Sequence, residues 1–169
     1  EACSNGLIEQ IEFDARMHKN IDGMEMNMEN QDGIDLRIGC NHFHLENITG
    51  RTGDDTIACT ALSGRHERAC AVPGKESHIH DVHIRNVMAD PFLHLIVRLL
   101  NQDGNQLYNI YMDSMFDSSN PFSKRKPKTI VGIGTPGNLY TTLRHVHNGE
   151  TRQIYGKNLY GRGSIAVRF

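Results

Sequence analysis

The chain has 169 residues, a formal net charge of −2 and 38% hydrophobic residues. A chain of this length predicts a single domain, residues 1–169, and the lack of a dominating basic face argues against a nucleic-acid-binding protein. No apolar run approaches the ~20 residues that a membrane-spanning helix needs, so we expect no membrane span.

The chain begins within a strand-like segment, residues 7–13, and ends in another, residues 164–169. Open strands expose unpaired backbone groups, so we expect further segments of the same protein, or other chains, to cover both ends. Residue 1 is Glu rather than Met, and no signal peptide is visible. This fits the removal of an export signal or of earlier segments, and it favours a secreted or periplasmic location.

An acidic motif around residue 32 recurs 23 residues later, at residue 55. Asp32 precedes a short apolar strand at residues 33–36, and Asp54 and Asp55 precede an equivalent strand at residues 56–59. Parallel strands stack ~4.8 Å apart, so this offset gathers three carboxylates on one face. Like charges this close raise at least one pKa and supply a proton donor beside a base. Paired carboxylates of this kind hydrolyse glycosides.

The same residues have a simpler interpretation, because Asp and Gly are common in turns. An Asp-Gly or Gly-Asp pair beside a strand often marks only a change of direction. A turn needs one Asp, however, whereas Asp54 and Asp55 are adjacent and register with a third carboxylate, Asp32. The conjunction of the two motifs favours a functional site.

An alternating apolar and polar pattern recurs four times, and each copy turns at Asn or Ser. The copies are residues 43–48, 82–87, 110–115 and 154–159. Alternation predicts strands with one buried face, and a recurring pattern is typical of a solenoid. The outward positions should form a stacked surface column of rings, made by His44, His83, Tyr111 and Tyr155.

The uneven spacing of the copies predicts two inserted loops. Asn47 and Asn86 are 39 residues apart rather than 23, which indicates a loop over residues 62–76, directly after the paired acids. A second loop is expected over residues 117–128. Loops on a rigid scaffold tend to carry specificity, although a short charge run is also typical of a solvated loop without a ligand. The candidate substrate contacts in these loops are Arg65, Arg68, Lys124 and Lys126.

We expect neither a cofactor nor a metal site. Four cysteines without a Cys-x-x-Cys pair argue against structural zinc. Three histidine pairs have a spacing that metal sites use: His42 with His44, His78 with His80, and His145 with His147. No Asp or Glu stands between them in a recognisable metal motif, and ten histidines produce such pairs without a function.

The acidic motifs resemble those of the polygalacturonase-type glycoside hydrolases, which belong to the pectin lyase-like family. The family's Asn-Thr-Asp signature appears as Asn-Gln-Asp at residues 30–32, and its paired Asp signature as Gly-Asp-Asp at residues 53–55. The resemblance implies an all-β fold, a right-handed parallel β-helix (solenoid), of which this chain would be a C-terminal portion lacking N-terminal rungs. It also implies inverting hydrolysis, with Asp54 as general acid and with Asp32 and Asp55 activating water.

Outside residues 30–60 the resemblance is looser. The family's Gly-His-Gly element corresponds to a region that contains His78 and His80 but no glycines, and its Arg-Ile-Lys element has Arg98 as the nearest match. These three residues are candidate substrate contacts, and Asn30 is a candidate for orienting Asp32. The resemblance supports acid chemistry better than it supports pectin as the substrate.

The sequence therefore predicts a glycosidase that cleaves an acidic or plant-type polysaccharide with inversion. One alternative is a polysaccharide lyase, which removes a proton α to a carboxylate, often with Ca²⁺ held by acidic residues. Asp32, Asp54 and Asp55 would suit such a role. The other alternative is a non-catalytic β-helix, such as a phage tailspike segment or a surface adhesin, in which the acids cap turns.

Overall fold

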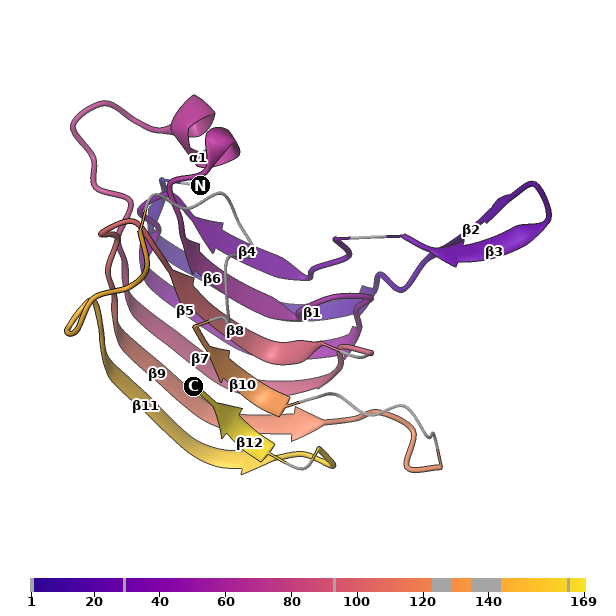
Figure 1. Cartoon of the computed structure of the whole chain (residues 1–169). Coiled ribbons are helices and arrows are strands. Elements are labelled where there is room, and N and C mark those ends of the chain that lie inside the picture. Colours follow the sequence, from indigo (N-terminus) through magenta and orange to yellow (C-terminus); the bar gives the residue numbers. More distant parts are fainter. Residues whose placement is uncertain (1, 29, 93, 123–128, 135–143, 164) are drawn as a thin grey trace.

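The computed structural model describes residues 2–28, 30–92, 94–122, 129–134, 144–163 and 165–169. Within these residues, the strands form two five-stranded parallel sheets and one two-stranded hairpin (Figure 1). The long-strand sheet has the order β1 (Ser4–Asp14), β5 (Asn41–Arg51), β7 (Ile79–Asp90), β9 (Leu107–Asp117) and β11 (Thr151–Tyr160). The short-strand sheet has the order β12 (Ile165–Arg168), β10 (Thr129–Ile133), β8 (Leu95–Asn101), β6 (Ile57–Ala61) and β4 (Ile34–Arg37).

Successive strands of the two large sheets lie in opposite sheets. From β4 onward, each strand of one sheet is followed in the chain by a strand of the other. Parallel strands cannot be joined by a tight turn and need a crossover connection, and here each crossover contains a strand of the opposite sheet. The two sheets face each other in Figure 1, and the buried apolar cluster draws its side chains from both.

The predicted right-handed parallel β-helix is wrong. The strands form two separate five-stranded parallel sheets, and the described residues contain a single helix, α1 (Arg65–Cys70). The prediction rested on the recurring alternation of apolar and polar residues, which indicates only which strands are parallel neighbours. Stacked parallel strands give the same repeat in an open sheet as in a solenoid, so the repeat could not decide between them. The expectation of missing N-terminal rungs depended on the same fold.

The four recurring segments are stacked strands of the long-strand sheet, in the predicted register. Phe43 pairs with Val82, Val82 with Ile110, and Ile110 with Ile154. Within each recurring segment, one residue has a left-handed φ of 54–64°, after which the alternation of inward and outward side chains resumes one residue later. Asn adopts this backbone more readily than most residues. The four residues are Asn47, Asn86, Ser114 and Asn158.

The register of the short-strand sheet is also the predicted one at its acidic end. Ile34 pairs with Ile57, and both side chains are buried in the core. Burying an isoleucine side chain stabilises the fold by ~1.5–3 kcal/mol. This pairing fixes which residues precede β4 and β6 side by side, and so it sets the position of the acids.

The predicted loop at residues 62–76 contains α1. Glu67 of α1 is buried and accepts a hydrogen bond from Arg37 Nη1 at 3.1 Å, which holds the helix against β4. The hairpin of β2 (His18–Ile21) and β3 (Met24–Asn27) projects from the two sheets (Figure 1). In the described part of the chain, no helix is long and apolar enough to span a membrane.

Candidate active site

The acids gather at one end of the short-strand sheet, where β4, β6 and β8 begin. Asp32, Asp54 and Asp55 line one groove of about 620 Å³. The groove continues over the outer face of the sheet, because alternate strand residues point away from the core. The residues that line it are Asn30, Asp32, Gly33, Asp35, Arg37, Asp54, Asp55, Ala58, Thr60, His94 and Arg98.

Backbone pairing continues beyond the strands and holds the acidic segments side by side. The Gly33 N–H donates to the Asp55 carbonyl oxygen at 3.0 Å, and the Thr56 N–H donates to the Leu95 carbonyl oxygen at 3.0 Å. A Cβ at position 33 would lie 2.5 Å from the Thr56 carbonyl oxygen. Only glycine permits so close an approach of two backbones, and this approach carries Asp32 toward Asp55.

Asp54 forms a pair with His94. His94 Nδ1 lies 2.9 Å from Asp54 Oδ1, and the backbone N–H of Asp55 donates to the same oxygen at 2.9 Å. Burial raises the pKa of Asp54, but the contacts with His94 and Asp55 outweigh burial and hold the pKa below its ordinary value. The hydrogen bond to Asp54 in turn raises the pKa of His94. Asp54 is therefore an ionised carboxylate at neutral pH, oriented by an imidazole.

Asp55 is the most buried of the three acids, with 2% of its surface exposed. Its Oδ1 accepts a hydrogen bond from the Leu95 N–H at 2.9 Å, and its Oδ2 pairs with Arg98 Nε. Burial raises the pKa of Asp55, against the opposing effect of Arg98. Because both carboxylate oxygens are already bonded, Asp55 mainly positions Arg98 in the groove.

Asp32 differs from Asp54 and Asp55 because no positively charged residue contributes to its pKa. Burial first, and then the negative charges of Asp35, Asp54 and Asp55, raise the pKa of Asp32 to about 7. A hydrogen bond with the Asp55 backbone opposes this rise only in part. Asp32 therefore holds a proton in mildly acidic solution while Asp54 beside it is ionised.

The other predicted site residues divide into two groups. Asn30 and Arg98 line the groove with the three acids. His78 lies elsewhere, with Nδ1 accepting from the Gln106 N–H at 3.1 Å, and His80 contacts Asp81. Neither histidine lines the groove.

The cationic loop residues are not brought to the groove by any described contact. Arg68 Nη1 donates to the Ser63 carbonyl oxygen at 2.5 Å, so its guanidinium folds back beside its own helix. Arg65 begins α1, but its side chain is not among those described. Lys124 and Lys126 lie outside the described residues.

Three residues of the groove, His94, Asp35 and Arg37, were not predicted from the sequence. A signal for His94 was present, because the 39-residue spacing of Asn47 and Asn86, applied from Asp55, leads to residue 94. The family motif places its histidine about twenty residues after the paired acids, a spacing that does not include the predicted insertion at residues 62–76. Asp35 and Arg37 follow from strand alternation, since they occupy outward positions of β4.

A metal ion is one conceivable occupant of this groove. Asp54, Asp55 and His94 each offer a ligand atom within 4.8 Å of the others. However, Arg98 already pairs with Asp55, and its positive charge would repel a cation placed between them. The residues fit metal-free acid–base chemistry better than they fit a metal centre.

No protein-family model, curated protein or solved structure matches the chain. The resemblance to polygalacturonases therefore rests on the motifs within residues 30–60.

Proposed function

We propose that the chain is a glycoside hydrolase that cleaves an acidic or plant-type polysaccharide by an inverting carboxylate mechanism. The observation that carries the proposal is the contrast between two acids in one open groove. Asp32 has a pKa of about 7, whereas the pKa of Asp54 is held below its ordinary value. A protonated and an ionised carboxyl side by side are the pair that glycoside hydrolysis needs.

In the proposed reaction, Asp32 donates its proton to the glycosidic oxygen as the bond from that oxygen to the anomeric carbon breaks. Asp54, held by His94 at 2.9 Å, takes a proton from a water molecule that attacks the anomeric carbon from the opposite face. The products are two shorter sugar chains, and one water molecule is consumed. The sequence motif assigned the acid to Asp54 instead, but an ionised Asp54 is better suited to the base.

Two arginines of the groove favour an acidic substrate. Arg98 and Arg37 both line the groove, and each is held by carboxylates, Arg98 by Asp55 and Arg37 by Asp35 and Glu67. The positive charges of both guanidinium groups favour a substrate that carries carboxylates, because arginine donates charge-assisted hydrogen bonds to such groups. The proposed partner is therefore a polysaccharide or oligosaccharide, and the resident acids need no cofactor.

The test is hydrolysis of acidic and plant-type polysaccharides, such as polygalacturonate, by the wild type and by Asp32→Asn and Asp54→Asn. Each substitution should lower the rate by ~10²–10⁴-fold, the usual contribution of a general acid or base. An aryl glycoside with an activated leaving group needs no protonation, so it should restore most of the rate to Asp32→Asn and little to Asp54→Asn. Asp14→Asn is the matched control, since Asp14 is 73% exposed on β1.

The products distinguish the alternatives. A hydrolase releases reducing ends, a lyase releases an unsaturated sugar that absorbs in the ultraviolet, and a non-catalytic binder releases neither. The proposal is overturned if the wild type yields only unsaturated sugar or no product, or if both variants retain full activity. Restoration of Asp54→Asn rather than Asp32→Asn by the aryl glycoside would return the acid role to Asp54.

A further inference from the structure

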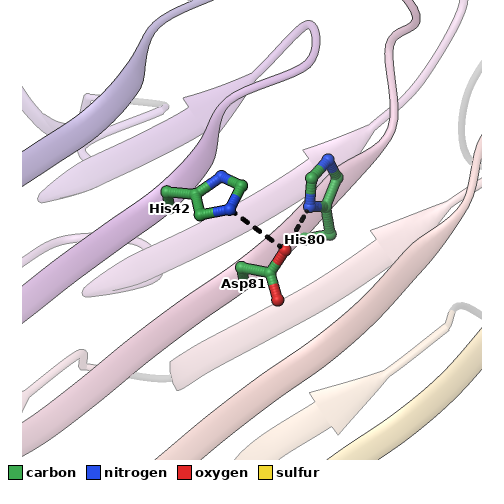
Figure 2. Close-up of side chains that lie close together, drawn as sticks. All are labelled: His42, His80 and Asp81. Atoms are coloured by element: carbon green, nitrogen blue, oxygen red, sulfur yellow. Dashed lines mark hydrogen bonds and ion pairs between the residues drawn. The ribbon is translucent and has the colours of Figure 1, made fainter.

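Two histidines and one aspartate meet at the start of β5 and β7, on the long-strand sheet. Figure 2 shows the rings of His42 and His80 on either side of the Asp81 carboxylate. His80 Nδ1 lies 2.6 Å from Asp81 Oδ2, and His42 Nε2 lies 3.6 Å from the same oxygen. One donor atom from each residue lies within 4.8 Å of the other two. None of the three residues lines the acidic groove, which belongs to the other sheet.

The backbone explains how neighbouring residues reach the same point. Successive side chains of a regular strand point to opposite faces, so His80 and Asp81 would ordinarily diverge. Asp81 has a left-handed φ of 53°, and His42, at the corresponding place on β5, has a φ of 55°. This conformation is uncommon for residues other than glycine. It interrupts the alternation on both strands and gathers the three side chains.

Each of the three side chains also has an outer contact that fixes its orientation. His42 Nδ1 lies 2.8 Å from Asn41 Oδ1, so a proton on Nδ1 leaves the lone pair of Nε2 directed at Asp81. Asp81 Oδ1 accepts from Asn109 Nδ2 at 2.9 Å, which leaves Oδ2 for the imidazoles. The His80 ring stacks on Tyr108 with centroids 4.8 Å apart. Metal-binding histidines and carboxylates are typically fixed by outer hydrogen bonds of this kind.

We propose that His42, His80 and Asp81 bind a divalent transition-metal ion, with Zn²⁺ as the best match. Two imidazoles and one carboxylate are a donor set of catalytic zinc sites, in which a fourth position stays open to solvent. Zinc–ligand bonds of ~2.0–2.2 Å place donor atoms about 3.3 Å apart in a tetrahedral site. This value lies between the observed separations, 3.6 Å from His42 to Asp81 and 2.6 Å from His80 to Asp81, so binding requires His80 and Asp81 to move apart. One oxygen ligand is too few for Ca²⁺ or Mg²⁺, which prefer all-oxygen sites.

The electrostatics agree with a cation at this point. In the described part of the chain, no lysine or arginine forms an ion pair with Asp81, which contacts the two imidazoles and Asn109. A metal ion would supply the positive charge that the carboxylate lacks. It would also replace the close contact between His80 and Asp81 with two bonds to one centre.

The experiment is a calorimetric titration of the full chain, without a polyhistidine tag, with Zn²⁺ alone. The wild type should bind one Zn²⁺ that His42→Ala and His80→Ala both lose, and Zn²⁺ should raise the Tm of the wild type but not of these variants. Asn109→Ala removes only an outer partner, so it should weaken binding by ~10–100-fold. His44→Ala and His83→Ala are the matched controls, since they remove imidazoles from the same sheet outside the cluster.

Co²⁺ provides a second readout, because a bound Co²⁺ ion absorbs visible light according to its ligands. The absorption band should appear in the wild type and in the two control variants, and it should be lost in the ligand variants. If an alanine variant does not fold, Asp81→Asn tests the same site, since it keeps the shape of the side chain. The proposal is overturned if the wild type binds no Zn²⁺, or if the ligand variants bind it as the controls do.

Discussion

The outer faces of the two sheets are built by the same register but differ in what the register brings together. On the long-strand sheet, rings stack in a column with centroids 4.7–4.9 Å apart, as the sequence predicted for His44, His83, Tyr111 and Tyr155. Beside them, charges of opposite sign alternate along Glu46, Arg85, Asp113 and Lys157. On the short-strand sheet, the register instead brings Asp32, Asp54 and Asp55 together.

The two faces differ in whether neighbouring charged side chains are paired. In the row of charges on the long-strand sheet, each side chain has a neighbour of opposite sign: Arg85 contacts Glu46 at 2.8 Å, and Lys157 contacts Asp113 at 3.1 Å. In the groove, Asp54 pairs with His94 and Asp55 with Arg98, whereas burial first, and then the neighbouring negative charges, raise the pKa of Asp32 to about 7. A parallel register thus stabilises the sheet where opposite charges are neighbours, and it creates a proton donor where a buried acid lies beside like charges.

The largest effect on stability is expected where a charge of the groove is buried. Arg98→Ala leaves Asp55, which is 2% exposed, without its ion-pair partner, and such a loss typically costs ~3–5 kcal/mol. Arg85→Ala removes a side chain that is 62% exposed, so water screens its ion pair and its loss should cost much less. Urea denaturation of both variants measures the contrast. Equal losses of unfolding free energy would show that the ion pair in the groove stabilises the fold no more than the exposed pair of Arg85 and Glu46.

A smaller, pH-dependent effect is expected for Asp32→Asn. The pKa of Asp32 is about 7 in the folded chain and 3.8 in the reference state, so the folded state holds this proton more tightly. The wild type therefore loses stability as pH rises from about 4 to about 7, and the loss is complete above that range. Asn carries no charge, so Asp32→Asn should melt a few degrees above the wild type at pH 8, with a smaller gain at pH 5.

Asp113→Asn is the control for this measurement. The pKa of Asp113 is lowered by its hydrogen bonds to Asn158 and Lys157, so its contribution is present at neutral pH and is lost on acidification. Asp113→Asn should therefore give no gain at pH 8. A pH-independent gain in Asp32→Asn would contradict the raised pKa.

The smallest effect is expected within the column of rings. Tyr111 stacks between His83 and Tyr155, and replacing it with Leu keeps an apolar body but removes two ring contacts. Aromatic pairs contribute ~0.5–1.5 kcal/mol beyond their buried area. Thermal denaturation of Tyr111→Leu should show a loss of this size, with hydrolysis unchanged. A large loss of hydrolysis would place the substrate on the long-strand sheet instead of in the groove.

The sequence predicted much of the local structure because alternation and register are local properties. The recurring segments became β5, β7, β9 and β11, and their pairing followed the repeats. The fold was predicted wrongly, because the repeats describe neighbours within one sheet and carry no information on how the second sheet is arranged. The short buried strands, such as β6 with all five residues buried, show no alternation that would assign a face.

The acids of the groove were predictable, but their roles were not. Spacing alone placed Asp32, Asp54 and Asp55 together, since an offset between strands decides which residues are neighbours. Which acid keeps its proton depends on burial and on partners such as His94, and neither can be read from spacing. The cationic loops were poor guides, because a guanidinium such as that of Arg68 can bond to the nearest backbone carbonyl instead of a ligand.

The alternation of strands between the two sheets also affects the rate of folding. Every strand pair of the large sheets joins distant segments, and the side-chain bonds between neighbouring strands span 28 residues from Asp81 to Asn109 and 45 from Asp113 to Asn158. Chain closure of this length must be completed before the contacts stabilise anything. Folds dominated by such non-local pairings form in milliseconds to seconds rather than microseconds. The newly made chain therefore passes through a long interval in which its parallel strand edges are open to neighbouring molecules.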